Sequence, residues 1–214
     1  MFKLRLVFSK NDEAAYISHL DLMKSLQRSF CRAKLPVKYS EGFNPHICMS
    51  ILSPLSTGYR SQYELCDLDL TCDKMPDRVI ERLNNALPNG IRVIKAYSAN
   101  EGKRVAEIAN SKFEIFMEGG NAEQLQDVFK KPVTFEKKSK RGSKQVNVLD
   151  YIKSISFSNI EKGCLCSCIL SAGDDPLNPS YIVSILRNME LLDINGTVRY
   201  TRTSILDKNC ELFI

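Results

Sequence analysis

The chain of 214 residues contains two histidines, and imidazole is the side chain that titrates near neutral pH. His19 follows Ser18 and precedes Asp21, a spacing that resembles a capping box at the start of a helix. His46 ends the turn-forming segment 42–46. If the two rings met, they could act as general base and general acid in RNA cleavage without a metal ion. Nothing in the sequence brings them together, and a histidine at a helix start also caps and packs.

Phe43 is an aromatic residue in a segment, 39–46, that is otherwise rich in turn formers. An exposed ring at this position could stack on a nucleic-acid base or on another flat ligand. The alternative is that the ring folds inward and plugs a gap in the core.

Positive charge is concentrated in two places. Lys24, Arg28 and Arg32 are spaced four residues apart, so a helix aligns them as a track for phosphates, although a solvated helix face is the favoured interpretation. Segment 130–144 holds seven cations and one carboxylate, an excess larger than the net charge of +5 of the whole chain. This favours a polyanion partner, and a solvated lysine-rich hairpin fits equally well. The candidate anion-binding residues are Lys24, Arg32, Lys137, Lys138, Lys140, Arg141 and Lys144.

Common catalytic signatures are absent from the sequence, among them a Walker loop, a nucleophile elbow and an H-E-x-x-H site. We therefore expect no self-contained catalytic site and no cofactor.

The eight cysteines include no C-x-x-C pair. Cys164, Cys166 and Cys168 alternate along an expected strand, which predicts three small core residues on one face, with a metal site as the less favoured alternative.

The elements that must position these residues follow the order strand, helix, strand, strand, helix, strand, and this order occurs twice. It predicts an α+β fold of two ferredoxin-like (split β-α-β) units in tandem. The units are expected at 1–98 and 111–214, with a basic hairpin at 132–148 inserted in the second. The expected strands are 3–9, 47–52, 61–72, 91–97, 113–117, 152–158, 163–171 and 197–201. Two helices are expected to begin at Ser18 and at Pro179, and two others to span 76–87 and 121–130.

Hydrophobic residues make up 43% of the chain, which is enough to bury a core. No run of about 18 apolar residues occurs, and the first seven residues alternate apolar and charged side chains. We therefore expect a cytoplasmic protein that does not enter a membrane.

The chain resembles a bacterial family of radical SAM-associated proteins of unknown function. The resemblance lies in the run 16–21, Arg28, the pair Leu35-Pro36, the segment 39–46, Ser50 and the stretch 138–148. Members are separate small proteins or are fused behind a radical SAM domain. The resemblance implies a radical SAM partner and, through a gene neighbourhood of ribonuclease G and ribosomal protein genes, a connection to RNA. Ile47 and Cys48 depart from the family, which commonly has proline and a basic residue there, so an anion contact of that basic residue would be lost. The motif positions carried over are Ser18, His19, Asp21, Arg28, Ser40, Gly42, Phe43, Asn44, Pro45 and His46.

Three functions are open at this point. The favoured one is a non-catalytic accessory module for a radical SAM partner, which binds RNA or presents an RNA-linked substrate. The second is a metal-independent endoribonuclease of the tandem ferredoxin-like type, which is weakened by the scarcity of histidine and by the isolated glycines near the end of the sequence. The third is a protein-interaction scaffold that docks its partner through the segment 40–46.

Overall fold

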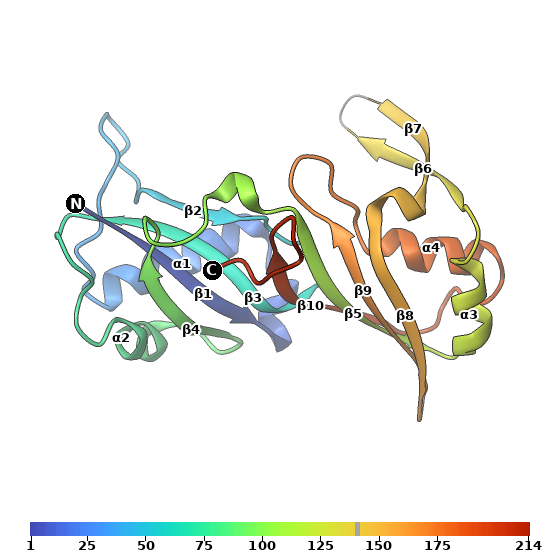
Figure 1. The fold of residues 1–214 in the computed structure, drawn as a ribbon. Helices are drawn as coiled ribbons and strands as arrows, with labels where there is room; N and C mark the ends of the chain where they lie inside the picture. Colours follow the sequence, from blue (N-terminus) through green and yellow to red (C-terminus); the bar gives the residue numbers. More distant parts are fainter. Residues whose placement is uncertain (140–141) are drawn as a thin grey trace. The chain divides into compact units, whose positions relative to one another are not determined.

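The computed structural model describes residues 1–139 and 142–214, which form a mixed α+β fold with four α-helices and antiparallel strand pairs within each unit (Figure 1). The chain divides into two compact units, Met1–Ile108 with Glu211–Ile214, and Ala109–Cys210. Across the described residues, no helix combines the length and the apolar character that a bilayer crossing requires.

The first unit contains a four-stranded sheet in the order β4-β1-β3-β2. Helices α1 and α2 cover one face, where Leu26 and Phe30 of α1 and Leu83 of α2 share a core with Leu6 and Phe8 of β1. The bounds are β1 (Phe2–Lys10), α1 (His19–Arg32), β2 (Met49–Leu52), β3 (Arg60–Leu70), α2 (Val79–Ala86) and β4 (Ile91–Ser98), with short 3-10 helices at Asp12–Tyr16 and Val105–Glu107.

The ends of the two helices in the first unit are tied together by arginines. Arg32 Nη2 donates to the carbonyl oxygen of Ala86, the last residue of α2, at 2.6 Å. In return, Arg82 Nη2 donates to the carbonyl oxygens of Ala33 at 2.6 Å and of Lys34 at 2.7 Å, just after α1. These contacts satisfy carbonyl groups that the final turn of a helix leaves without partners.

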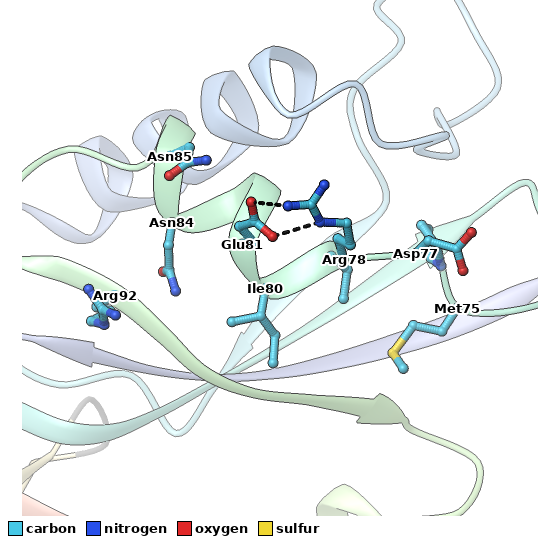
Figure 2. A pocket seen from close by; sticks show the side chains of 10 residues that line it. Met75, Asp77, Arg78, Ile80, Glu81, Asn84, Asn85 and Arg92 are labelled. Carbon is cyan, nitrogen blue, oxygen red and sulfur yellow. Dashed lines mark hydrogen bonds and ion pairs between the residues drawn. The ribbon is translucent and has the colours of Figure 1, made fainter.

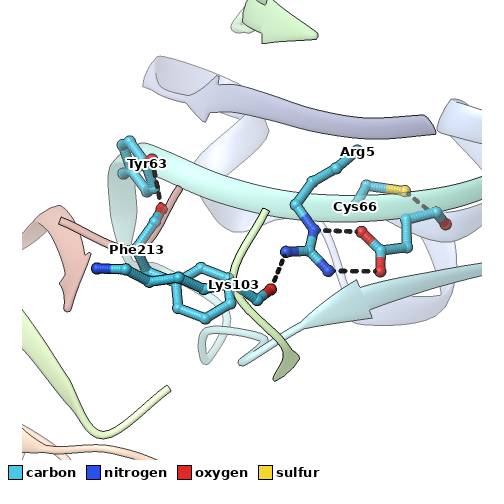
Figure 3. Close-up of polar contacts among 6 residues, drawn as sticks. Arg5, Tyr63, Cys66, Lys103 and Phe213 are labelled. Carbon is cyan, nitrogen blue, oxygen red and sulfur yellow. Dashed lines mark hydrogen bonds and ion pairs between the residues drawn. The ribbon is translucent and has the colours of Figure 1, made fainter. Parts of the chain in front are cut away.

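An ion pair is buried on the other face of the first sheet, and Figure 3 shows its contacts. Arg5 Nε and Nη2 donate to the two carboxylate oxygens of Asp67 at 2.6 and 2.9 Å, and Arg5 Nη1 donates to the carbonyl oxygen of Lys103 at 2.6 Å. Both charged side chains are less than 5% exposed. The guanidinium also lies 5.3 Å from the ring centroid of Phe213, and Tyr63 Oη donates to the Phe213 carbonyl oxygen at 2.8 Å.

Residues 211–214, expected in the second half, pack on the first unit. Phe213 is fully buried there. The backbone N–H of Lys103 donates to the carbonyl oxygen of Ile214 at 2.7 Å, and Lys103 Nζ donates to that of Leu212 at 3.1 Å. The return of this segment follows from the burial of one aromatic ring and from backbone pairing, neither of which has a periodic signature in the sequence.

The second unit has a sheet in the order β10-β5-β9-β8, the same succession of fourth, first, third and second strand as in the first unit. Cys164, Cys166 and Cys168 are buried on one face of β9, opposite Met117, Ile115 and Phe113 of β5, which confirms their prediction as core residues. The bounds are β5 (Asn110–Glu118), α3 (Ala122–Val128), β6 (Thr134–Ser139), β7 (Gly142–Asn147), β8 (Ile152–Ile160), β9 (Gly163–Ser171), α4 (Ser180–Asn188) and β10 (Val198–Leu206), with a 3-10 helix at Val148–Tyr151.

The inserted hairpin forms a separate two-stranded sheet of β6 and β7. Helix α4, expected to begin at Pro179, begins one residue later, because Pro179 occupies the capping position and Asn178 Oδ1 accepts from the backbone N–H of Ser180 at 2.9 Å.

Candidate nucleic-acid interface

The base of the β6–β7 hairpin is held to the rest of the second unit by an aromatic contact. Phe135 of β6 packs against Tyr181 of α4, with ring centroids 4.6 Å apart. Asn147 Oδ1 accepts from the backbone N–H of Val133 at 3.1 Å, and the N–H of Val148 donates to the Val133 carbonyl oxygen at 2.9 Å. The hairpin therefore leaves the unit at a fixed base.

Lys137 forms a second attachment two residues further along β6. Its Nζ lies 4.1 Å from the ring centroid of Tyr151 and is paired with Asp175 Oδ1. Tyr151 Oη donates to the other carboxylate oxygen, Oδ2, at 2.8 Å. The hydrogen bonds from Lys137 and Tyr151 lower the pKa of Asp175, and the hydrogen bond to Asp175 raises the pKa of Tyr151.

The register of the hairpin places like charges opposite each other. Lys137 pairs with Lys144, and Lys138 pairs with Ser143. Lys144 is exposed, so its charge faces solvent beside a lysine that is already neutralised by Asp175. The predicted contributors Lys140 and Arg141 lie outside the described residues, and the side chain of Lys138 is not described.

The cationic line predicted on α1 is divided between two roles. Lys24 and Arg28 are exposed and available to an anion. Arg32 is also exposed, yet its Nε and Nη2 both donate to Ala86 O, at 3.2 and 2.6 Å, and Nη2 also donates to Ser29 Oγ at 2.9 Å. Most of its donors therefore serve the packing of α1 on α2.

The predicted cap of α1 forms. Ser18 Oγ accepts from the backbone N–H of Asp21 at 3.1 Å and donates to Asp21 Oδ2 at 2.7 Å. His19 is the first residue of the helix and is exposed.

The segment 40–46 is a closed loop that projects an aromatic ring. At its base, Tyr39 bridges Ile47, and Ser40 N–H donates to the His46 carbonyl oxygen at 2.8 Å. Ser40 Oγ lies 2.8 Å from His46 Nδ1 and accepts from the His46 backbone N–H at 3.0 Å. Phe43 is fully exposed, so the inward plug does not form. The other predicted loop residues, exposed around it, are Gly42, Asn44 and Pro45.

Helix α1 separates the two histidines. The loop follows the C-terminal end of the helix, where Cys31 Sγ lies 3.7 Å from Tyr39 Oη. His19 is at the opposite end, 12 residues earlier, which at 1.5 Å per residue is about 18 Å along the axis. The structure therefore holds the imidazoles at opposite ends of α1 and does not assemble them into an acid–base pair.

A hollow of about 750 Å³ lies beside α2 and contains none of the predicted residues (Figure 2). Several of its polar groups are already paired. Arg78 donates to both carboxylate oxygens of Glu81 at 2.7 and 2.6 Å, and the side chain of Asn84 bonds the backbone N–H and carbonyl of Val93 at 2.8 and 3.0 Å. The other polar side chains that line it, those of Asp77, Asn85 and Arg92, are exposed to solvent, and we do not assign the hollow a function.

Sequence reasoning missed Tyr151 and Asp175, which complete the surroundings of Lys137. They are 14 and 38 residues away from it along the chain. The acidic pair Asp174-Asp175, separated from the end of β9 by two residues, could have indicated Asp175, because a chain with one strongly basic segment can place acidic residues against that segment.

Residues 3–179 match the profile of a family described as an uncharacterized protein conserved in bacteria (DUF2344). The chain belongs to this bacterial family. A comparison with curated proteins gives no match. Among solved structures, the chain is similar to an unknown protein from Galdieria sulphuraria, with 11% sequence identity and a TM-score of 0.29 over 94% of this chain and 98% of that one.

Proposed function

We propose that this member of the family is a non-catalytic accessory module that binds RNA through the β6–β7 hairpin and serves a radical SAM partner protein. The observation that carries the RNA part is the anchored basic hairpin. Its base is fixed by Phe135 and Lys137, while the sequence of its outer part supplies further cations. Lysine and arginine on a projecting ribbon contact the phosphate backbone, which supplies most of the sequence-independent affinity for nucleic acids.

We infer that both units are ferredoxin-like, because each has its strands in the order fourth, first, third, second and two α-helices between them. Single-stranded RNA is commonly bound by domains with such four-stranded sheets. The radical SAM partner is proposed from the motif resemblance of the segments around Ser18 and Phe43.

The endoribonuclease alternative is less well supported, because it needs His19 and His46 in one site and they lie at opposite ends of α1. Incubation of the purified protein with RNA in the presence of a chelator tests it. We expect intact RNA; cleavage that is lost in His46→Ala would favour the nuclease.

Titration of a labelled single-stranded RNA by fluorescence anisotropy, at several salt concentrations, tests the proposal. We expect micromolar or tighter binding that weakens steeply with salt. Reversal of Lys138, Lys140 and Arg141 to glutamate should lower the slope of log K against log salt by about 2, at roughly 0.7 per lost phosphate contact on a single strand.

The matched control reverses three exposed lysines elsewhere, Lys74, Lys162 and Lys208. It changes the net charge by the same amount, so it separates local contact from overall charge. Equal weakening by both triple variants, or no binding by the unaltered protein at low salt, would reject the hairpin as the RNA-binding element.

A docking role for the loop 40–46 is a second candidate, favoured by the full exposure of Phe43 on a closed loop. Aromatic anchors of this kind fill pockets at the centre of protein interfaces. Pull-down of the radical SAM protein from the same genome by Phe43→Ala should be weaker than by the unaltered chain. Undiminished capture would place the docking site elsewhere.

A further inference from the structure

Asp175 is held in the manner of a bound anion. One carboxylate oxygen is paired with Lys137 Nζ, and the other accepts a hydrogen bond from Tyr151 Oη at 2.8 Å. The lysine is positioned by the face of the Tyr151 ring, 4.1 Å from its centroid. Two donors from separate elements, β6 and the 3-10 helix before β8, thus converge on a single carboxylate.

The surroundings carry more positive charge than Asp175 neutralises. Lys144 lies directly opposite Lys137 in the hairpin register, and its charge contributes to the low pKa of Asp175. The Asp175 side chain is 70% exposed, whereas the Lys137 side chain is only 12% exposed. The cation is therefore fixed in place, and the carboxylate is the solvent-facing, exchangeable partner.

We propose that Lys137, Tyr151 and Lys144 form a subsite for a phosphodiester group of RNA, which Asp175 occupies as an internal substitute until RNA displaces it. The proposal rests on the proposed RNA-binding function. Carboxylate and phosphate oxygens accept from the same charged and hydroxyl donors. Because the Asp175 carboxylate is 70% exposed, water weakens its pairing with Lys137, so a phosphate within a polyanion can replace it.

Substitution of Asp175 gives opposite signs under the two roles that it can have. If the carboxylate competes with RNA, Asp175→Asn keeps the side-chain shape, removes the competitor and tightens binding by about two- to fivefold. If the carboxylate only anchors the hairpin, the same change loosens the attachment of the hairpin through Lys137 and weakens binding. Asp174→Asn is the matched control, because it removes the same charge from the neighbouring exposed residue.

A second pair of variants tests the contact with Tyr151. In the Asp175→Asn background, Tyr151→Phe removes the hydroxyl and keeps the ring under Lys137. The subsite predicts about two- to fivefold weaker RNA binding on this further change, because the hydroxyl donates to the phosphate. No effect would mean that the hydroxyl serves Asp175 alone.

Anisotropy titration of single-stranded RNA at one fixed salt concentration measures all of these affinities, with circular dichroism to check that each variant folds. Tighter binding by Asp175→Asn than by Asp174→Asn, together with the loss caused by Tyr151→Phe, supports the subsite. If the unaltered protein binds RNA and Asp175→Asn binds no tighter than Asp174→Asn, the subsite alone is rejected. If no variant binds RNA, both proposals fail.

Discussion

The buried ion pair of the first unit gives the sharpest stability prediction. Asp67→Ala removes both oxygens that Arg5 Nε and Nη2 contact. Of the three hydrogen bonds described for the guanidinium, the one to the Lys103 carbonyl oxygen remains. The hydrogen bonds that Arg5 donates to Asp67 raise the pKa of Arg5. The Arg5 side chain is 3% exposed, and the arginine stays charged without this partner. Leaving a buried charge uncompensated costs about 3–5 kcal/mol.

That loss is a large part of the roughly 5–15 kcal/mol by which folded domains are stable. Urea unfolding followed by circular dichroism measures it. The matched control is Glu81→Ala, because Arg78 and Glu81 form the same two-contact geometry with side chains that are 74% and 53% exposed. An exposed pair of this kind contributes at most about 1 kcal/mol.

The double variant Arg5→Met with Asp67→Leu extends the test. It replaces the buried pair by apolar side chains, which in other proteins is neutral or stabilising, so we expect it to recover most of the loss. Equal costs for Asp67→Ala and Glu81→Ala would refute the reasoning from burial. A double variant no more stable than Asp67→Ala would refute the assignment of the cost to an uncompensated charge.

Three further predictions concern other parts of the chain. Burial raises the pKa of Tyr63 to about 12 from about 10, so the folded state keeps the phenol proton to higher pH than the unfolded state does. The stability that this difference contributes is fully present below pH 10 and is lost between about pH 10 and 12. Tyr63→Phe should reduce this loss in alkaline unfolding curves. Ser18→Ala removes the cap of α1 and should lower the free energy of unfolding by about 1 kcal/mol in urea titrations, with unchanged stability as the refuting result. Phe135→Ala removes the ring contact with Tyr181 and should speed amide hydrogen exchange in the β6–β7 hairpin, whereas unchanged rates would exclude this contact as the anchor.

Local patterns in the sequence predict local structure well. The Ser18 cap needs four residues to be recognised, and the alternation of Cys164, Cys166 and Cys168 needs five, so both are visible without the fold. The succession of strands and helices follows from the same kind of signal. The 3-10 helices are only three to five residues long, which is too short for a periodic pattern, and the sequence did not predict them.

Contacts between distant residues decide what the charged side chains do. The partners Arg5 and Asp67 are 62 residues apart, and Arg32 meets Ala86 at a separation of 54. In the sequence, Arg32 is one of three equally spaced cations, and the structure distinguishes it by the helix end that it contacts. Patterns of charge therefore locate a candidate surface, but the pairing that removes individual cations from it requires the tertiary structure.

Lys144 offers a final test, because it should affect stability and binding in opposite directions. It lies opposite Lys137 in the hairpin, where like charges destabilise cross-strand pairs by a few tenths to about 1 kcal/mol, and Asp175 offsets only one of them. Lys144→Thr should therefore slow hydrogen exchange in the hairpin, since threonine also favours strands, and it should weaken RNA binding. Slower exchange with unchanged RNA affinity would mean that the lysine pair does not contact RNA. A more stable hairpin together with weaker binding would support an external anion that offsets the repulsion between the two lysines.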